Sequence, residues 1–322
     1  MSGMWFLPLF ALIVSWFVVK LLLRRASMLP LDHPNERSLH QHPTPRIGGL
    51  GIMAGLAICS LFLRPDDVFV LAVLAVGLSA LSLLDDMRGL SVRVRFASHV
   101  LAAAVTVYAL PEMPVWVSWL AVPAIVWMTN LYNFMDGSDG LAGGMALFGF
   151  ISFGAAAWLG GAVSFALLAW IIAAAAAGFL VFNFPPARVF MGDAGSIPLG
   201  YLAAALGLAG WATDLWPVVF PLLVFSPFIV DASVTLARRS WRGEKIWQAH
   251  RSHYYQRLVR VGWSHRRLAL FEYGVMAAAG ISGLVLLQYP LMQSVVLLVW
   301  GMFYLALAIV IDRRWKESGL AS

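Results

Sequence analysis

The sequence predicts an all-α, polytopic integral membrane protein, and three observations support this prediction. Of its 322 residues, 61% are hydrophobic and only 12% are charged, whereas soluble domains average about 45–50% and about 25%. The apolar residues form long runs, and one membrane crossing needs roughly 20 of them. The basic residues fall between alternate runs. Because little of the chain is left for a soluble part, we expect residues 1–322 to form one transmembrane domain.

Eleven apolar runs follow one another along the chain. The first is too long for a signal-peptide core, and its positive charges follow it, so we expect it to be retained as a helix. Turn-forming proline and glycine and charged residues separate the runs, as at 64–67 and 110–114. The expected transmembrane helices cover 4–23, 47–63, 68–84, 96–110, 115–132, 140–158, 163–182, 197–212, 217–236, 269–288 and 292–311.

The positive charges assign the two sides of the membrane. With eleven helices, all but Arg64 of the 22 lysine and arginine residues lie on one side, and cytoplasmic loops are the ones that accumulate such residues. We therefore expect a periplasmic N-terminus and a cytoplasmic C-terminus. The net charge of +6 reflects this topology, and nucleic acid is not an expected partner. The single cysteine, Cys59, excludes an intrachain disulfide and a cysteine-rich metal site.

Five aspartates lie at the predicted cytoplasmic ends of these helices: Asp85, Asp86, Asp136, Asp139 and Asp193. For any one of them, solvation of a helix end is a sufficient explanation. As a group, however, they would repel each other and the anionic leaflet, and a hard divalent cation relieves that repulsion. We therefore expect Mg²⁺ together with a phosphate group at this face.

Two segments surround these acids with glycine. Residues 130–144 place Asp136 and Asp139 between glycines ahead of an apolar run, and backbone N–H groups at such a helix start bind anions. Gly143 and Gly144 have an alternative role as a helix contact. Residues 182–200 break an apolar stretch at Pro185 and then offer Asp193.

The 182–200 segment leaves two alternatives open. Asp193 or Ser196 can cap the following helix instead of binding a ligand. Phe190 can stack on a nucleobase, although aromatic residues at a membrane boundary usually anchor the interface.

Two further loops carry cations. In residues 238–268, His250 and His253 share a predicted helix face with Arg257, which gives a compact cationic face suited to a diphosphate. Contact with lipid headgroups is the alternative, and two histidines alone fall short of a zinc site. Residues 32–51 repeat the theme with Arg37, His40, His42 and Arg46, although a simple connecting loop would also explain them.

Together these segments resemble a known family. DD followed by LSVRVRF (85–96), NxxNxxDGxDGLAGG, NFxPARVFMGDAGS, TPRIGG and a histidine-containing basic loop resemble the polyprenyl-phosphate N-acetylhexosamine-1-phosphate transferases (glycosyltransferase family 4). This superfamily includes phospho-MurNAc-pentapeptide translocase and undecaprenyl-phosphate GlcNAc-1-phosphate transferase. The resemblance covers nearly the whole chain, and its motifs are specific in combination.

The resemblance implies a reaction and a location. Undecaprenyl phosphate would attack the β-phosphorus of a UDP-linked HexNAc and release UMP, at the cytoplasmic face of the bacterial inner membrane. The catalytic loops would be 24–46, 85–95, 133–139, 183–196 and 238–268. Membrane lipids would surround the protein, and a homodimer is compatible with the likeness.

The resemblance also implies residue roles. Asp193 would ligate Mg²⁺, with Mn²⁺ as a substitute, and Asp85 would join it as ligand or would deprotonate or orient the lipid phosphate beside Asp86. The substrate-binding residues would be Arg46, Asn133, Asp136, Asp139, Asn183, Phe190, His250, Arg251 and His253.

Departures from the family pattern narrow the substrate. Peptidoglycan translocases carry a triple-histidine HHHFE where this chain has HRSHYYQRL, which argues against MurNAc-pentapeptide. DDMRGLSVRVRF and AHRSHYYQRL instead resemble the branch that initiates O-antigen or related surface polysaccharides, with GlcNAc, FucNAc or QuiNAc as the sugar. The remaining alternatives are a peptidoglycan-type translocase, a secondary transporter and a non-catalytic subunit that binds the lipid carrier.

Overall fold

The computed structural model describes residues 4–25, 31–32, 39, 43–63, 67–111, 113–245, 248 and 250–320. Over this part of the chain the fold is helical, apart from one short antiparallel pair that joins Leu31 to Pro45 and Asp32 to Thr44. In chain order the elements are α1 (Leu7–Leu23), β1 (Leu31–Asp32), β2 (Thr44–Pro45), α2 (Gly49–Ser60), α3 (Asp67–Arg88), α4 (Val92–Ala109), α5 (Val115–Phe134), α6 (Leu141–Leu159), α7 (Val163–Asn183), α8 (Asp193–Ala212), α9 (Val219–Val224), α10 (Ser226–Trp241), α11 (Tyr254–Arg260), α12 (His265–Gln288), the 3-10 turn η2 (Pro290–Met292) and α13 (Gln293–Glu317).

The predicted all-α membrane fold is confirmed at the level of its class. Within the described residues, eight helices are long and apolar enough to cross a membrane, and α1 and α2 are shorter apolar helices. Every predicted run coincides with a helix, except that run 217–236 is divided into α9 and α10. Pro227, which has no N–H to donate, lies in the first turn of α10. The total of eleven crossings stays a prediction.

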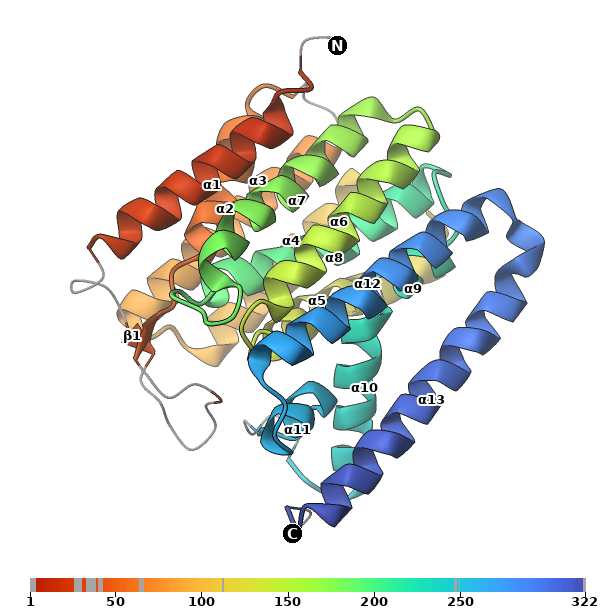
Figure 1. Ribbon diagram of the computed structural model, residues 1–322. Helices are drawn as coiled ribbons and strands as arrows, with labels where there is room; N and C mark the ends of the chain where they lie inside the picture. The colour runs from red at the N-terminus through yellow and green to blue at the C-terminus, as the bar shows by residue number, and fades with distance from the viewer. Residues whose placement is uncertain are drawn as a thin grey trace.

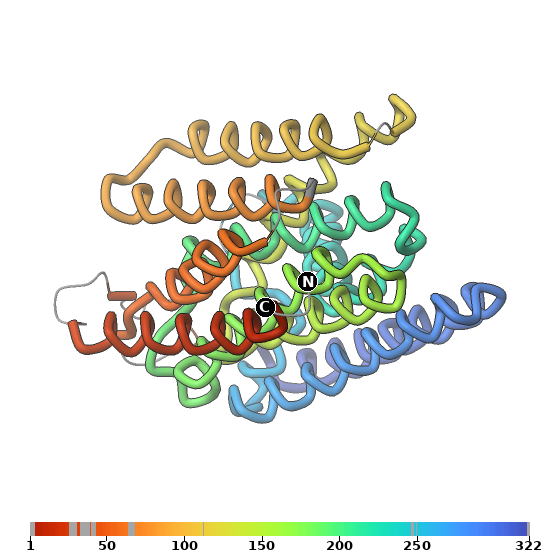
Figure 2. The backbone as a smooth tube through the Cα atoms, turned by 90° about the horizontal axis from the view of Figure 1, so that it is seen from above, coloured from red at the N-terminus to blue at the C-terminus, as the bar shows by residue number. Residues whose placement is uncertain are grey.

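The helices pack in two rows. α1, α7, α6 and α12 lie next to one another in the first row, and α3, α8 and α5 form the second. α2 lies between α1, α7 and α3, while α4 covers the outside of α3 and α5 (Figure 2). α8 is the most enclosed of the long helices, with 83% of its apolar window buried, whereas α13 has only 6% buried. The core therefore sits around α6, α7 and α8.

Small residues allow these helices to approach closely. A Cβ on Gly144 would run into the ring of Tyr273 in α12, and one on Gly143 would meet Leu180 in α7. The helix-contact alternative for this glycine pair is therefore confirmed, since small side chains let membrane helices pack tightly.

The polar loops meet at one end of the bundle. α3, α5, α7 and α10 end there, while α4, α6, α8 and α12 begin there. In Figure 1, α13 ends on this side and α1 starts at the opposite end. That the end with the polar loops faces the cytoplasm, and the opposite end the periplasm, stays a prediction.

Candidate active site

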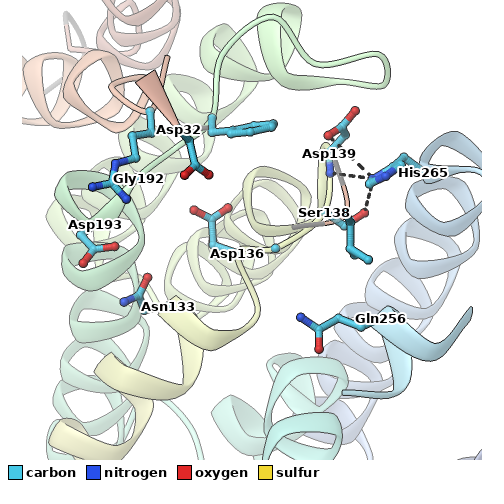
Figure 3. Close-up of a pocket in the computed structure, with 13 residues that line it drawn as sticks. Asp32, Asn133, Asp136, Ser138, Asp139, Gly192, Asp193, Gln256 and His265 are labelled. Atoms are coloured by element: carbon cyan, nitrogen blue, oxygen red, sulfur yellow. Dashed lines mark hydrogen bonds and ion pairs between the residues drawn. The ribbon is translucent and has the colours of Figure 1, made fainter. Parts of the chain in front are cut away.

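A polar cavity of about 350 Å³ opens at this end of the bundle. Its wall comes from segments that are far apart in the sequence: the β1–β2 region, the end of α5, the α5–α6 loop, the start of α8, α11 and the start of α12 (Figure 3). The lining residues are Asp32, Leu39, Arg46, Asn133, Asp136, Gly137, Ser138, Asp139, Phe190, Gly192, Asp193, Gln256 and His265. Six of the residues predicted from sequence thus line one space: Arg46, Asn133, Asp136, Asp139, Phe190 and Asp193.

The α5–α6 loop supplies two carboxylates that are held differently. Asp139 Oδ2 accepts a hydrogen bond from the backbone N–H of Ala187 at 3.0 Å. Beside it, Nδ1 of His265 lies 2.8 Å from the hydroxyl of Ser138. Asp136 points toward the cavity (Figure 3), and burial together with the charge of Asp193 raises its pKa well above its usual range. Asp139 is therefore held by the loop before α8, while Asp136, which accepts a backbone hydrogen bond from Gly192, faces the space where a ligand would lie.

The start of α8 forms the next wall. Gly192, at the N-cap, has φ +70°, and a Cβ there would collide with the backbone of Arg46, so only glycine allows this close approach. Asp193 follows in the first turn of α8. Asn133 lies between Asp193 and Ser196, because Ser196 Oγ donates to Asn133 Oδ1 at 2.8 Å and the Asn133 side chain also bonds Asp193.

The segment around β2 holds Arg46 and Phe190 in the wall. The backbone N–H of Phe190 donates to Pro45 O at 2.8 Å, and Gly48 N–H donates to Phe190 O at 2.9 Å. Arg46 Nη2 donates to Asp86 Oδ1 at 3.1 Å. The Arg46 side chain is 42% exposed, so the remaining N–H groups of its guanidinium can reach an anionic ligand such as a phosphate.

The Asp85–Asp86 pair lies at the end of α3, outside the cavity lining. Both Asp85 oxygens are engaged, since Leu90 N–H donates to Oδ1 at 2.7 Å and Arg95 Nη1 to Oδ2 at 3.0 Å. Asp86 bonds only Arg46 in the part of the chain that the structure describes. Asp86 is thus linked to the cavity wall through Arg46, and both Asp85 and Asp86 are close enough to Asp193 for their charges to interact.

Asn183 connects two loops of the site. It is buried at the end of α7, where its Oδ1 accepts from Gly140 N–H at 3.0 Å and its Nδ2 donates to Val189 O at 2.9 Å. Gly140 has φ +74° and precedes α6. Asn183 therefore ties the α5–α6 loop to the loop that carries Phe190, without lining the cavity itself.

The prediction that residues 238–268 form a cationic helix face is wrong. α11 begins only at Tyr254, so His250 and His253 do not share a helix face with Arg257. Burial, then the neighbouring His253 and Arg239, lower the pKa of His250 to about 4, which leaves it uncharged at neutral pH. Arg257 donates to Asp312 at 2.8 Å. None of these three lines the cavity, and neither does Arg251, which is exposed.

Several functional candidates were missed by the sequence reasoning. Asp32, Gln256 and His265 line the cavity, and Asp231 of α10 lies 3.3 Å from Nδ1 of His253. The signal for Asp231 was present, because a carboxylate inside an apolar run usually marks a functional site. Of the early-loop candidates, Arg37, His40 and His42 lie outside the described residues.

The cavity offers oxygen ligands to a cation without forming a closed metal cage. No three His, Cys, Asp or Glu side chains within the described ranges gather closely enough to hold a metal ion by themselves. Asp193 and Asp136 nevertheless present carboxylate oxygens to one space, beside Asn133, whose amide oxygen accepts from Ser196. Mg²⁺ is commonly bound by one or two carboxylates plus substrate phosphates and water, so this donor set fits that ion.

An apolar groove of about 490 Å³ runs between α4, α5 and α10. Its lining includes Phe96, Trp127, Phe134 and Leu236. Phe96 adjoins Arg95, the partner of Asp85, and Phe134 lies two residues before Asp136. The groove therefore ends close to both the acidic pair and the polar cavity.

Comparison with known proteins finds a matching family and several relatives. The family model described as glycosyl transferase family 4 matches residues 68–210. A probable undecaprenyl-phosphate N-acetylglucosaminyl 1-phosphate transferase of Bacillus subtilis is 31% identical, over 80% of this chain and 77% of its own. A decaprenyl-phosphate N-acetylglucosaminephosphotransferase of Mycobacterium tuberculosis is 30% identical, over 85% and 81%. A phospho-N-acetylmuramoyl-pentapeptide-transferase of Moorella thermoacetica is 32% identical, over 76% and 84%.

Proposed function

Because the chain belongs to glycosyl transferase family 4, the superfamily of polyprenyl-phosphate HexNAc-1-phosphate transferases, we propose that it transfers a HexNAc-1-phosphate from a UDP-sugar to undecaprenyl phosphate. An oxygen of the lipid phosphate attacks the β-phosphorus of the donor, the bond from that phosphorus to the bridging oxygen breaks, and UMP leaves with the bridging oxygen. The product is undecaprenyl-pyrophosphoryl-HexNAc. The reaction takes place at the cytoplasmic face of the inner membrane.

The observation that carries this proposal is the shared cavity of Arg46, Asn133, Asp136, Asp139, Phe190 and Asp193. Phosphoryl transfer asks a protein mainly for positioning and for neutralisation of charge. Phe190 offers a ring for the uracil base, and the partly exposed guanidinium of Arg46 offers N–H donors to a phosphate oxygen. Asp193 and Asp136 would hold Mg²⁺, with Asn133 orienting the Asp193 carboxylate, and the ion when bound would neutralise charge on the diphosphate.

The acceptor lipid would approach along the groove between α4, α5 and α10. Its apolar lining suits part of an isoprenoid tail, which packs against apolar side chains as it does against lipid chains. The phosphate at the end of that tail would then lie beside Asp86. Since Asp86 has one oxygen without a hydrogen-bond partner among the described residues, whereas both Asp85 oxygens are engaged, Asp86 is the better placed of the two to orient the lipid phosphate or take its proton.

The sugar is proposed from similarity. The Bacillus and Mycobacterium relatives carry N-acetylglucosamine in their names, so UDP-GlcNAc is the first donor to test, with FucNAc and QuiNAc donors beside it. The product would initiate an O-antigen or a related surface polysaccharide. A second candidate is the peptidoglycan donor UDP-MurNAc-pentapeptide, which the Moorella relative favours and the HRSHYYQRL segment disfavours.

The test is a release assay for UMP with purified protein, undecaprenyl phosphate, Mg²⁺ and a panel of these UDP-sugars. Asp193→Asn and removal of Mg²⁺ by chelation should each abolish UMP release, because both remove charge neutralisation at the diphosphate. Asp214→Asn is the matched control, since Asp214 is an exposed acid just beyond the far end of α8. Full activity after either treatment would contradict metal-assisted transfer, and no UMP with any donor would contradict the function itself.

A further inference from the structure

The short helix α11 joins the donor cavity to two carboxylates that lie outside it. Gln256 in α11 lines the cavity, whereas Asp231 of α10 and Asp312 of α13 do not. Both carboxylates nevertheless contact α11 or the residues that lead into it. α11 has only seven residues, too few to be stable without outside contacts, so these contacts decide where it sits.

Asp231 holds the first turn of α11. Its Oδ1 accepts from Tyr254 N–H and its Oδ2 from Tyr255 N–H, both at 2.9 Å. Nδ1 of His253 lies 3.3 Å from Oδ1, and His253 is only 2% exposed. One carboxylate from a neighbouring helix thus binds two of the backbone donors that a helix start leaves without intrahelical partners.

The far side of the same turn touches the donor cavity. The hydroxyl of Tyr255, which is 1% exposed, donates to Phe134 O at 3.2 Å, two residues before Asp136. The Gln256 side-chain oxygen accepts from His253 N–H at 3.2 Å, which leaves its amide nitrogen directed to the Asp136–Ser138 loop (Figure 3). The docking of α11 therefore sets the position of Gln256 and braces the loop that carries Asp136.

Asp312 holds the next turn. Its carboxylate accepts from Arg257 at 2.8 Å and from Arg238 of α10 at 2.6 Å, and the Arg257 side chain is 8% exposed. Trp315, three residues further along α13, lies under the guanidinium of Arg260 at 4.5 Å. The last helix of the chain, which buries little else, is thereby fastened to α11.

We propose that Asp231 and Asp312 are positioning residues for the UDP-sugar: they clamp α11 so that Gln256 and the Asp136 loop are held ready for the donor. This inference rests on the proposed function. Neither carboxylate touches a substrate, so each acts through α11. Asp231 has the larger effect on Gln256, because it bonds the backbone N–H groups of Tyr254 and Tyr255, the two residues just before Gln256.

The test measures KM for the UDP-sugar and for undecaprenyl phosphate separately, in Asp231→Asn, Asp312→Asn, Gln256→Ala and the Asp231→Asn/Gln256→Ala double variant. Asp231→Asn should raise the donor KM about 10-fold, the size expected when hydrogen bonds to a charged group are weakened, and leave the acceptor KM within about 2-fold. Asp312→Asn should raise the donor KM about 3-fold. In the double variant the two effects should fail to add, because contacts in one network are not additive.

Thermal unfolding of each variant and the Asp214→Asn control accompany the kinetics. The positioning role would be overturned if the KM values for donor and acceptor rose together. It would also be overturned if the effects of Asp231→Asn and Gln256→Ala added fully, because both results indicate a merely structural role. If Asp231→Asn does not fold, the proposal is tested with Asp312→Asn alone. An unchanged donor KM in that variant refutes the positioning role. Absence of UMP release in the wild type would instead refute the proposed function, so the two failures are distinguishable.

Discussion

At the scale of single residues, Asp136 combines a stability cost with a proposed role in binding. Burial and the negative charge of Asp193 raise its pKa well above that of an unfolded aspartate, so the folded state binds this proton more tightly than the unfolded state does. Between the unfolded pKa and the raised folded pKa, the free energy of unfolding therefore falls as the pH rises.

The prediction is that Asp136→Asn removes this cost while it abolishes transfer. Without Mg²⁺ at pH 7–8, the variant should have a higher Tm than the wild type, by about 1–2 °C for each kcal/mol in a chain of this length, and the difference should shrink toward pH 4. Thermal unfolding across this pH range, together with UMP release, measures both effects. A Tm that is lower than that of the wild type at pH 8 would show that Asp136 stabilises the fold instead.

At the scale of elements, the end of α7 joins the loops that build two walls of the cavity. The helix stops at Asn183 because Pro185 and Pro186 follow and a proline disfavours helical conformation in the residue before it. The Asn183 side chain then bonds Gly140 N–H and Val189 O. Replacing it leaves two buried backbone groups unpaired, each at a cost of about 1–3 kcal/mol.

Asn183→Ala should accordingly lower the Tm by several degrees and raise KM for the UDP-sugar, because Phe190 follows Val189 directly. Thr213→Ala is the control, since the Thr213 hydroxyl donates locally to Ala209 O at 2.8 Å, at the end of α8 that lies away from the cavity. Differential scanning fluorimetry and donor titration would measure the two effects. If both alanine variants lost the same stability and kept the same donor KM, the bridging role of Asn183 would be refuted.

At the scale of the whole molecule, the orientation in the membrane stays a prediction that one labelling experiment can decide. The only cysteine, Cys59, is fully buried, so introduced cysteines can be labelled against a silent background. Thr213→Cys, at the exposed end of α8, should react with a membrane-impermeant maleimide in cells whose outer membrane is permeabilised and whose inner membrane is intact. Arg242→Cys, exposed beyond α10, should react only once the inner membrane is permeabilised. The reverse pattern would invert the topology and place the cavity outside.

The sequence alone determined the class of fold and the family, because both depend on local properties. A membrane helix satisfies its own backbone hydrogen bonds, so twenty apolar residues suffice to predict it, and the motifs around Asp136 and Asp193 can be recognised without knowing their neighbours. The same reasoning placed His250, His253 and Arg257 on one helix, and it was wrong there because the α11 helix starts only where Asp231 of another helix caps it.

Which of the predicted residues share a cavity depends on how the helices pack against one another. The packing brings Arg46, Asn133, Asp136, Asp139, Phe190 and Asp193 to one space and adds Asp32, Gln256 and His265. It leaves Asp85, Asp86, Asn183, His250, Arg251 and His253 outside the lining. The physical reason is that distances between segments far apart in the chain are set by how α5, α8, α11 and α12 pack, and no local pattern of residues encodes that packing.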